Sequence, residues 1–283
     1  MIGVAAVVVS RNPDLFRFKS VLDSIINRVK HVVIVDNNSD NKSFIKDLCN
    51  KLNKCSFIEV GFNSGIAYAL MKGVHYVVNN YGLEWLLFLD DDTILLENAV
   101  NKVLSAYNGL PKFVKDRVGL IKLGVWNGDC RIYEILYGAF SGTLIKSDVA
   151  LRTCCRVNFF LDQADHDLYA RVRELGYLTL MMNCRLIDHR LGTEIRTPVL
   201  SKILRRRAIL YEPPWRYYYI VRNSTILLRE GRIDFYFYAR QLLWGLRILY
   251  RDGIRKFVKP LGLGLAHALL NNEGFIDNKY FIW

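Results

Sequence analysis

The chain has 283 residues, 52% of them hydrophobic, and no stretch approaches the ~20 apolar residues that a membrane-spanning helix needs. We therefore expect a globular protein that does not cross a membrane, folded as one large domain or as one domain with a C-terminal extension. The net charge of +12 indicates acidic partners: nucleic acid, an anionic lipid surface or a phosphorylated small molecule.

The N-terminal stretch and the cysteines favour a cytoplasmic protein. The apolar stretch from Met1 to Val9 lacks a basic leader and predicts a core strand rather than a signal peptide. The six cysteines form no CxxC pair and show no ligand-like spacing, so reduced, buried thiols are expected and a zinc site is not.

The first third of the chain alternates strand and helix patterns. Continuous β-branched or apolar runs predict strands at Val4–Val9, His31–Val35, Ser56–Val60 and Trp85–Leu89. Apolar residues at helical spacing predict helices at Leu15–Val29, Phe44–Leu52 and Ile66–Asn79. This order predicts an α/β fold with a Rossmann-like, mostly parallel central sheet flanked by helices and a ligand cleft at the carboxyl ends of the strands.

Three aspartates end the last of these strands. Adjacent carboxylates repel one another unless a cation lies among them, and alternate residues of an extended segment point the same way. Asp90 and Asp92 therefore form a candidate site for one divalent ion. The alternative is that Asp92 caps a helix over Ile94–Ala106, but this explains one aspartate and not three.

Small polar residues follow each of the other predicted parallel strands. They are Ser10-Arg11-Asn12, Asp36-Asn37-Asn38-Ser39 and Asn63-Ser64-Gly65. Such residues can hydrogen-bond a base and a ribose, although each loop alone is equally well explained as a turn or a helix cap. No GxGxxG or Walker pattern follows the first strand, so neither a dinucleotide cofactor nor a phosphate-cradling NTPase loop is predicted.

The middle of the chain predicts strands at Val118–Leu123 and Ile132–Leu136. A loop at Tyr137–Ile145 carries Gly138 and Gly142, which allow a substrate to approach the backbone closely.

A second acidic cluster opens a predicted helix that ends at Gly176. Asp162 fits the cap position, and Asp165 falls in the first turn, where the helix dipole keeps a carboxylate ionised. Asp165 is therefore the candidate general base, whereas Asp167 points elsewhere and suits an arginine partner or a substrate hydroxyl. His189 follows another apolar run; a histidine there is more often a structural hydrogen-bonding residue than a metal ligand.

The character of the sequence changes at Ser201. A basic run at Lys202, Arg205, Arg206 and Arg207 precedes aromatic and arginine residues interleaved over Trp215–Asn223. Two later segments, Phe235–Tyr250 and Ile254–Leu270, combine large apolar residues with cations. This composition is typical of helices at an anionic lipid interface; nucleic-acid binding is the competing explanation.

Taken in order, these motifs resemble the family 2 glycosyltransferases of the GT-A fold, most closely the rhamnosyltransferase-like and galactofuranosyltransferase-like members. The resemblance runs from Val4 to about Leu228. Its motifs are Val7-Val8-Val9-Ser10-Arg11-Asn12, Val35-Asp36-Asn37-Asn38-Ser39, Asn63-Ser64-Gly65-Ile66-Ala67, Leu89-Asp90-Asp91-Asp92, Asp162-x-x-Asp165-x-Asp167, His189-Arg190-Leu191-Gly192 and Arg216-Tyr217-Tyr218-Tyr219-x-x-Arg222-Asn223.

The resemblance implies a role for each motif. Asp90-x-Asp92 is similar to the family's DXD motif, which binds Mg²⁺ or Mn²⁺ with the donor diphosphate; His189 completes the metal site, and Asp165 is the catalytic base. The implied donor-binding residues are Ser10, Arg11, Asn12, Asp36, Asn38, Asn63, Gly65 and Asp91. The implied acceptor-binding residues are Gly142, Asp162, Asp167, Arg216 and Arg222. The chain departs from the family pattern at Asp167, where glutamate is more frequent, and at Ser10-Arg11-Asn12, where Thr-Tyr-Asn is more frequent.

The resemblance thus implies an inverting, metal-dependent glycosyltransferase. Its donor would be a nucleoside-diphosphate sugar of the dTDP-rhamnose or UDP-sugar type, and its acceptor a glycan or a polyprenyl-diphosphate-linked glycan. We expect a GT-A domain over residues 1–200, with a nucleotide-binding half (1–108) and an acceptor-binding half (109–200). A helical extension over 201–283 would contact the inner face of the cell membrane, with no nucleic acid bound. The alternatives are a nucleotidyltransferase with a similar sheet and a non-catalytic basic module that binds membrane or nucleic acid.

Overall fold

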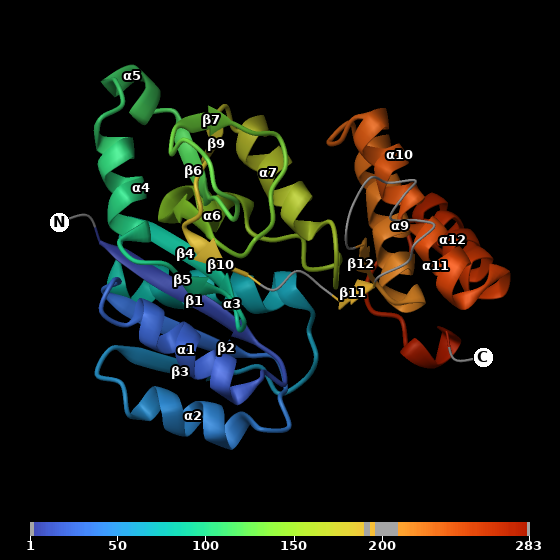
Figure 1. The fold of residues 1–283 in the computed structure, drawn as a ribbon, viewed down its shortest axis with the longest axis horizontal. Helices are drawn as coiled ribbons and strands as arrows, with labels where there is room; N and C mark the ends of the chain where they lie inside the picture. Colours follow the sequence, from blue (N-terminus) through green and yellow to red (C-terminus); the bar gives the residue numbers. More distant parts are fainter. Residues whose placement is uncertain (1–2, 190–192, 196–208, 282–283) are drawn as a thin grey trace. The chain divides into compact units, whose positions relative to one another are not determined.

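A computed structural model describes residues 3–189, 193–195 and 209–281 (Figure 1). The chain divides into two compact units: Met1–Val157 with Asp165–His189, and Asn158–Ala164 with Arg190–Trp283. The domain boundary predicted at residue 200 lies outside the described residues. A short segment from the middle of the chain, 158–164, thus belongs to the C-terminal unit.

The first unit is built on an eight-stranded sheet with the order β3-β2-β1-β4-β8-β6-β9-β7. β1 pairs in parallel with β2 and β4, and β2 pairs in parallel with β3, so four neighbouring strands end at the same edge. β8 runs antiparallel between β4 and β6. The strands are β1 (Val4–Ser10), β2 (His31–Asp36), β3 (Cys55–Glu59), β4 (Trp85–Asp90), β6 (Val118–Leu123), β7 (Ile132–Glu134), β8 (Thr143–Lys146) and β9 (Leu178–Met182).

Helices cover both faces of the sheet because the central strands are apolar on both sides. Val4, Ala6 and Val8 of β1 belong to one core with the helices α1, α2 and α4. The opposite face packs against α3 so closely that a Cβ at Gly73 would lie 2.3 Å from Val7 Cγ1. The helices of this unit are α1 (Leu15–Ile25), α2 (Lys42–Asn50), α3 (Ile66–Tyr81), α4 (Ala99–Asn108), α5 (Lys112–Lys115), α6 (Ser147–Thr153) and α7 (Ala164–Glu174). The predicted Rossmann-like α/β architecture is confirmed.

The start predicted for the helix over Ile94–Ala106 is wrong. The chain instead forms a short strand, β5 (Ile94–Leu95), which pairs antiparallel with β10 (Ile187–Asp188). Asn98 then adopts φ = 57°, in the left-handed region, and α4 begins only at Ala99. Asp92 is therefore not a helix cap, and β10 brings the following residues beside the aspartates.

The prediction of reduced thiols is wrong. The six cysteines form three disulfides, Cys49–Cys55, Cys130–Cys184 and Cys154–Cys155, and none is free. The argument from reduced thiols to a cytoplasmic protein therefore fails.

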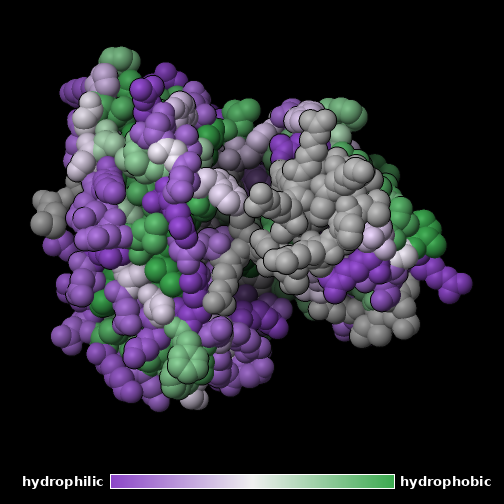
Figure 2. Space-filling view, viewed as in Figure 1, coloured by the Kyte–Doolittle hydropathy of each residue, from purple (hydrophilic) through white to green (hydrophobic). Residues whose placement is uncertain are grey.

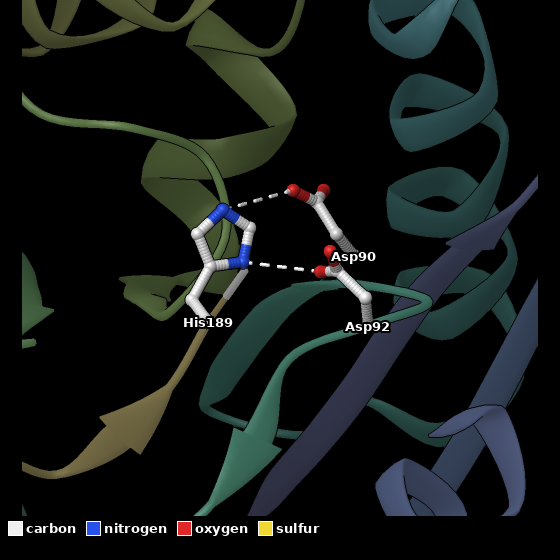
Figure 3. A group of neighbouring side chains, drawn as sticks. All are labelled: Asp90, Asp92 and His189. Carbon is white, nitrogen blue, oxygen red and sulfur yellow. Dashed lines mark ion pairs between the residues drawn. The ribbon is translucent and has the colours of Figure 1, made fainter. Parts of the chain in front are cut away.

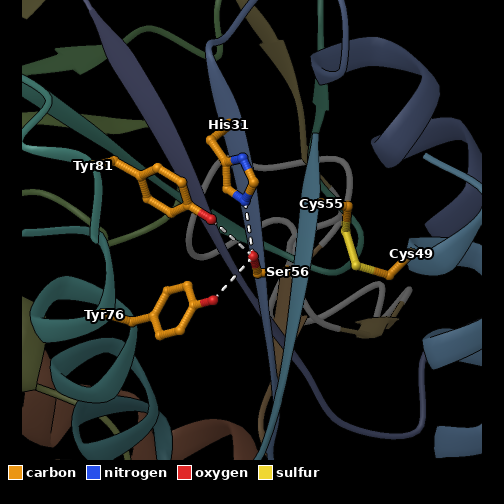
Figure 4. The surroundings of a disulfide bond; sticks show 6 residues. All are labelled: His31, Cys49, Cys55, Ser56, Tyr76 and Tyr81. Carbon is orange, nitrogen blue, oxygen red and sulfur yellow. Dashed lines mark hydrogen bonds between the residues drawn. A yellow bond between two sulfur atoms is a disulfide. The ribbon is translucent and has the colours of Figure 1, made fainter. Parts of the chain in front are cut away.

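The Cys49–Cys55 disulfide lies beside a polar network that closes the edge strand β3 onto α3 (Figure 4). The hydroxyl of Ser56 forms hydrogen bonds with His31 Nε2 at 2.9 Å, Tyr81 Oη at 3.1 Å and Tyr76 Oη at 3.2 Å. These side-chain hydrogen bonds link the edge strand β3 to β2 and to α3.

The C-terminal unit is built around α9 (Pro214–Arg229), which has consecutive buried residues from Tyr217 to Ser224. α12 (Ile254–Leu269) packs along α9, with Gly264 against Val221. The remaining elements are β11 (Thr193–Ile195), β12 (Ile209–Tyr211), α10 (Phe235–Leu243), α11 (Gly245–Asp252) and the 3-10 helix η1 (Asn278–Phe281). Among the described residues, no helix combines the length and the hydropathy needed to span a bilayer.

Two glycines of α12 test the packing of α12 on α9. A Cβ at Gly264 would lie 2.9 Å from Val221 Cβ, whereas a Cβ at Gly262 would have nothing within 4 Å. We expect Gly264→Ala to lower the free energy of unfolding by about 1–3 kcal/mol through overpacking. Gly262→Ala, the matched control, should raise it by up to about 1 kcal/mol through helix propensity. Urea denaturation followed by circular dichroism measures both, and equal effects would contradict the packing.

Candidate active site

Three side chains that could hold a metal ion meet at the carboxyl edge of the sheet. Asp90 ends β4, Asp92 lies in the following turn, and His189 directly follows β10 (Figure 3). Their ligand atoms all lie within 4.8 Å of one another. His189 Nδ1 is 3.1 Å from Asp92 Oδ1, and His189 Nε2 is 4.0 Å from Asp90 Oδ2. The structure thus brings together the three residues that the sequence predicted as metal ligands.

The buried hydroxyl groups of Thr93 and Ser141 form hydrogen bonds that support this cluster. Thr93 Oγ1 lies 2.5 Å from His189 Nδ1 and 2.7 Å from Ser141 Oγ. Ser141 Oγ also accepts the backbone N–H of Asp90 at 2.9 Å. The orientation of the imidazole and the end of β4 are therefore fixed by one hydrogen-bonded chain, as is usual for residues around a metal site.

Arg17 of α1 joins the two segments that carry the cluster. Its guanidinium donates to the carbonyl oxygen of Asp92 at 2.8 Å and to that of Asp188 at 2.7 Å. Nη2 also forms an ion pair with the Asp188 carboxylate at 2.9 Å. Because these contacts bridge the turn after β4 and the end of β10, Arg17 holds Asp92 and His189 side by side.

The charges of the cluster favour a cation. Burial raises the pKa of Asp90, against the effect of His189, and raises the pKa of Asp91 to about 7. Burial lowers the pKa of His189, but the hydrogen bond to Asp92 and the charges of Asp90 and Asp92 outweigh it, so the net shift is upward. Carboxylates crowded together in this way are stabilised by a bound positive charge.

The residue types fit a hard divalent ion. Two carboxylates and one imidazole, close to solvent, suit Mg²⁺ or Mn²⁺, which also keep water or phosphate oxygens among their ligands. Asp90, Asp92 and His189 form a group that could bind such an ion.

The loops after β1, β2 and β3 are tied together by polar side chains. Asp36 is fully buried and accepts hydrogen bonds from Ser10 Oγ at 3.3 Å and from the backbone of Ser39 at 3.0 Å. Asn37 Oδ1 accepts both the backbone N–H of Ser64, at 2.8 Å, and its hydroxyl, at 2.7 Å. The predicted donor-binding loops thus form one connected surface beside the metal cluster.

Further contacts fix the remaining predicted donor-binding residues in the same loops. The backbone N–H of Arg11 donates to Asp91 at 2.9 Å, and its guanidinium donates to the carbonyl of Asn37 at 3.3 Å. The Asn63 amide oxygen accepts from Asn37 at 3.4 Å. Left-handed backbone conformations shape the turns at Asn12 (φ 50°), Asn38 (φ 65°) and Gly65 (φ 79°).

Asp165 lies in the first turn of α7, in the same unit as the metal cluster. Its Oδ1 accepts the backbone N–H of His166 at 2.8 Å. Its charge raises the pKa of Asp90 and also that of Lys122, although burial makes the net shift of Lys122 downward. Asp165 therefore acts electrostatically on Asp90, and its role as base stays a prediction.

Two predicted acceptor-binding residues lie in the first unit. Gly142 has φ = 77°, and a Cβ there would lie 2.5 Å from Ile187 Cδ1, so no side chain fits. Asp167 is fully buried, 3.9 Å from Arg156 and 4.0 Å from Arg171. Its arginine neighbours agree with the first of the two roles suggested for it, and acceptor contact stays a prediction.

The other three belong to the C-terminal unit. Asp162 does not cap α7, which starts at Ala164; its two carboxylate oxygens accept from Arg216 at 2.6 Å and 3.2 Å. Arg216 also pairs with Glu212 at 2.6 Å. Arg222 is 1% exposed and donates to the carbonyl of Gly274 at 2.8 Å. These groups hold the unit together, and their contact with an acceptor stays a prediction.

Sequence reasoning missed four residues around the cluster: Arg17, Thr93, Lys122 and Ser141. Arg17, Thr93 and Ser141 act through tertiary contacts that no local pattern shows. Lys122 did leave a signal, because it is the single charged residue in the buried strand Val118–Leu123. A buried lysine needs a compensating partner or a function.

Comparisons with known proteins agree with this geometry. Residues 16–129 match the family model of Glycosyl transferase family 2. The chain is 25% identical over 271 residues to the dTDP-rhamnosyl transferase RfbF of Shigella flexneri, an alignment that covers 86% of each protein.

Solved structures show the same fold at low sequence identity. A mannosyltransferase from Pyrobaculum calidifontis, solved with GDP-Man and Mn²⁺, is similar over 95% of this chain and 74% of its own, with a TM-score of 0.55 and 16% identity. GalNAc-T7, solved with UDP, GalNAc and Mn²⁺, is similar over 85% of this chain, with a TM-score of 0.53 and 14% identity; the match spans 54% of its own length. These likenesses show that the chain has the GT-A fold, and over residues 16–129 its sequence is similar to the family 2 glycosyltransferases.

Proposed function

We propose that the chain transfers a sugar from a nucleoside-diphosphate sugar to a hydroxyl group of a glycan acceptor, with inversion at the anomeric carbon. The observation that carries the proposal is the meeting of Asp90, Asp92 and His189 within 4.8 Å at the edge where the polar loops end. The relative from Shigella flexneri, described as a dTDP-rhamnosyl transferase, supports a dTDP-sugar donor; a UDP-sugar is the second candidate.

The loops after β1, β2 and β3 would bind the nucleotide. Asp36 has one carboxylate oxygen near Ser10 and the other near Ser39, which fixes its plane for hydrogen bonding to a base. The backbone N–H of Arg11 donates to Asp91, so a hydrogen bond joins the loop after β1 to the turn after β4. A prearranged surface of this kind lowers the conformational entropy lost on binding.

Asp90, Asp92 and His189 would hold the Mg²⁺ or Mn²⁺ ion. When bound, the ion supplies positive charge to the oxygen of the leaving diphosphate. Arg17 and Thr93 contribute by keeping the ligands in place, since their contacts fix the turn after Asp90 and the ring of His189.

Asp165 would act as the general base. Its carboxylate accepts the backbone N–H of His166, and it can accept the proton that the acceptor hydroxyl loses during attack. Attack from the face opposite the leaving diphosphate, in one displacement, inverts the anomeric centre.

The C-terminal unit would hold the enzyme at an anionic membrane surface, where a polyprenyl-diphosphate-linked acceptor is found. Residues 190–283 contain 17 of the 39 Lys and Arg residues but only 7 of the 27 Asp and Glu residues.

On α12, Ile254 is 59% exposed, Val258 50% and Leu269 69%, and all three fall on one side of the helix. Arg255 is exposed beside them. Figure 2 shows hydrophobic and hydrophilic side chains next to one another over α11 and α12. Exposed apolar residues flanked by cations suit a negatively charged lipid surface.

The base is tested by Asp165→Asn, which keeps the shape of the side chain and removes its ability to accept a proton. We expect the transfer rate to fall by about 10²- to 10⁴-fold, with the affinity for the donor unchanged. Asp148→Asn, in the first turn of α6, is the matched control and should stay active. Loss of donor affinity in Asp165→Asn would show that the residue is a ligand rather than the base.

The metal site is tested by Asp92→Ala in a thermal-shift assay with dTDP or UDP and Mn²⁺. A ligand at ~100 times its Kd stabilises the native state by about 2.7 kcal/mol, so the wild type should melt several degrees higher. We expect Asp92→Ala, or EDTA added to the wild type, to abolish this shift. Asp47→Ala, at an exposed position of α2, is the control. A full shift in Asp92→Ala would contradict the site.

The membrane surface is tested by sedimentation with phosphatidylserine-containing vesicles and with neutral phosphatidylcholine vesicles. Each cation near the surface contributes about 1 kcal/mol, so Arg255→Glu should weaken binding to the anionic vesicles by about 10-fold or more at low salt. Arg131→Glu, at a 79% exposed arginine of the first unit, is the control. Equal binding to neutral vesicles, or equal loss in both variants, would overturn the assignment.

A further inference from the structure

Lys122 is a buried cation that the reaction as proposed does not use. It lies on β6 among Leu120, Ile121 and Leu123, and it is 8% exposed. Its ammonium group donates a hydrogen bond to the carbonyl oxygen of Ser141. Among the described residues, no ion pair and no second hydrogen bond of this group is present, so two of its three N–H bonds have no protein acceptor. Burying such a group is costly unless its charge and its donors are matched.

The neighbours of Lys122 place it between the metal cluster and the candidate base. Ser141, its hydrogen-bond partner, also bonds the backbone of Asp90 through its hydroxyl at 2.9 Å. In the sheet, Lys122 pairs with Thr143, whose hydroxyl lies 3.0 Å from Tyr169 Oη. Tyr169 lies one helical turn after Asp165 on α7. Lys122 is thus connected to Asp90 on one side and to the helix of Asp165 on the other.

Gly142 lies directly against the ammonium group of Lys122. A Cβ at this position would come within 3.0 Å of Lys122 Nζ, and the backbone has φ = 77°. Any other residue would therefore be strained and would press on the ammonium group. Charge agrees with the geometry, because burial lowers the pKa of Lys122 to about 8 while Asp90 and Asp165 act to raise it. At neutral pH most of the molecules keep the ammonium charged.

In a displacement that inverts the anomeric carbon, the transferred sugar lies between the leaving diphosphate and the base. In the proposed function, the diphosphate lies at Asp90 and Asp92, and Asp165 is the base. A group connected to both sides is suited to contact the sugar ring. We propose that Lys122 is a specificity-determining residue of the donor site, and that its two remaining N–H bonds donate to hydroxyl oxygens of the transferred sugar.

This inference rests on the proposed function and extends it, because it assigns a contact to the sugar and not to the nucleotide. Hydrogen bonds from a buried ammonium orient the ring and reject sugars whose hydroxyl groups point elsewhere. A site built to bond a hydroxyl discriminates strongly, since a sugar lacking that hydroxyl leaves the buried donor unpaired.

The experiment compares two affinities in two variants. For the wild type and Lys122→Met, isothermal titration calorimetry with Mn²⁺ gives the Kd of dTDP and of dTDP-rhamnose, with UDP and UDP-sugars run in parallel. The pair that binds the wild type best is then compared across variants. Lys146→Met is the matched control, because Lys146 lies at the far end of the neighbouring strand β8 and bonds the carbonyl of Lys115 at 3.1 Å.

We expect Lys122→Met to raise the Kd of the nucleotide sugar by about 10- to 100-fold, in line with the loss of charge-assisted hydrogen bonds, and to leave the Kd of the nucleoside diphosphate within about twofold. Lys146→Met should change neither. If the methionine variant does not fold, Lys122→Gln, which keeps an uncharged N–H donor, replaces it. We expect Lys122→Gln to raise the Kd of the nucleotide sugar by a smaller factor and to leave the Kd of the nucleoside diphosphate unchanged.

Two results would overturn the inference. Equal weakening of the nucleoside diphosphate and the nucleotide sugar would place Lys122 at the diphosphate, and no weakening of either would make it a purely structural residue. If the wild type itself bound no nucleotide sugar in the presence of Mn²⁺, the proposed function would fail, and this outcome is separate from the two above.

Discussion

The candidate site depends on the contacts of Arg17 with two segments that are far apart in the chain. Its guanidinium donates to the carbonyl oxygen of Asp92, in the turn before β5, and to that of Asp188, at the end of β10. The short antiparallel pair of β5 and β10 is the second link between these segments. Because both links act next to the ligands, Asp92 and His189 are held together before any ion is bound, which reduces the ordering required on binding.

The loops at the carboxyl ends of the parallel strands are also held in place by hydrogen bonds. Side-chain oxygens take the place of backbone partners where the parallel strands end, as Asp36 does for Ser39 and Asn37 does for Ser64. These loops carry no regular secondary structure, yet the backbone N–H groups of Ser39 and Ser64 are satisfied within the protein. A nucleotide would therefore meet a surface whose hydrogen-bonding groups are already oriented.

Charge is distributed unevenly along the chain, in a way that suits the proposed reaction. The first unit gathers carboxylates around one edge of its sheet, with Lys122 as the buried cation among them. The C-terminal unit carries most of the excess positive charge. An acidic cluster needs a cation for phosphate chemistry, whereas exposed cations beside apolar residues suit an anionic surface. In the proposed function, the first unit would thus hold the metal ion and the C-terminal unit would contact the anionic surface.

The sequence by itself determined the mostly parallel α/β architecture of the first unit and indicated Asp90 and Asp92 as candidate metal ligands, to which the family resemblance added His189. Buried parallel strands leave continuous apolar runs, and Asp90, Asp92 and His189 stand directly after such runs, where the edge of a sheet gathers ligands. Only the tertiary structure decided the pairing of β5 with β10, the Cys130–Cys184 disulfide, the ion pair of Asp162 with Arg216 and the contacts of Arg17. These depend on which distant segments meet, and local periodicity carries no information about such meetings. Lys122 lies between the two cases: its place in an apolar strand was visible in the sequence, but its partners were set by the fold.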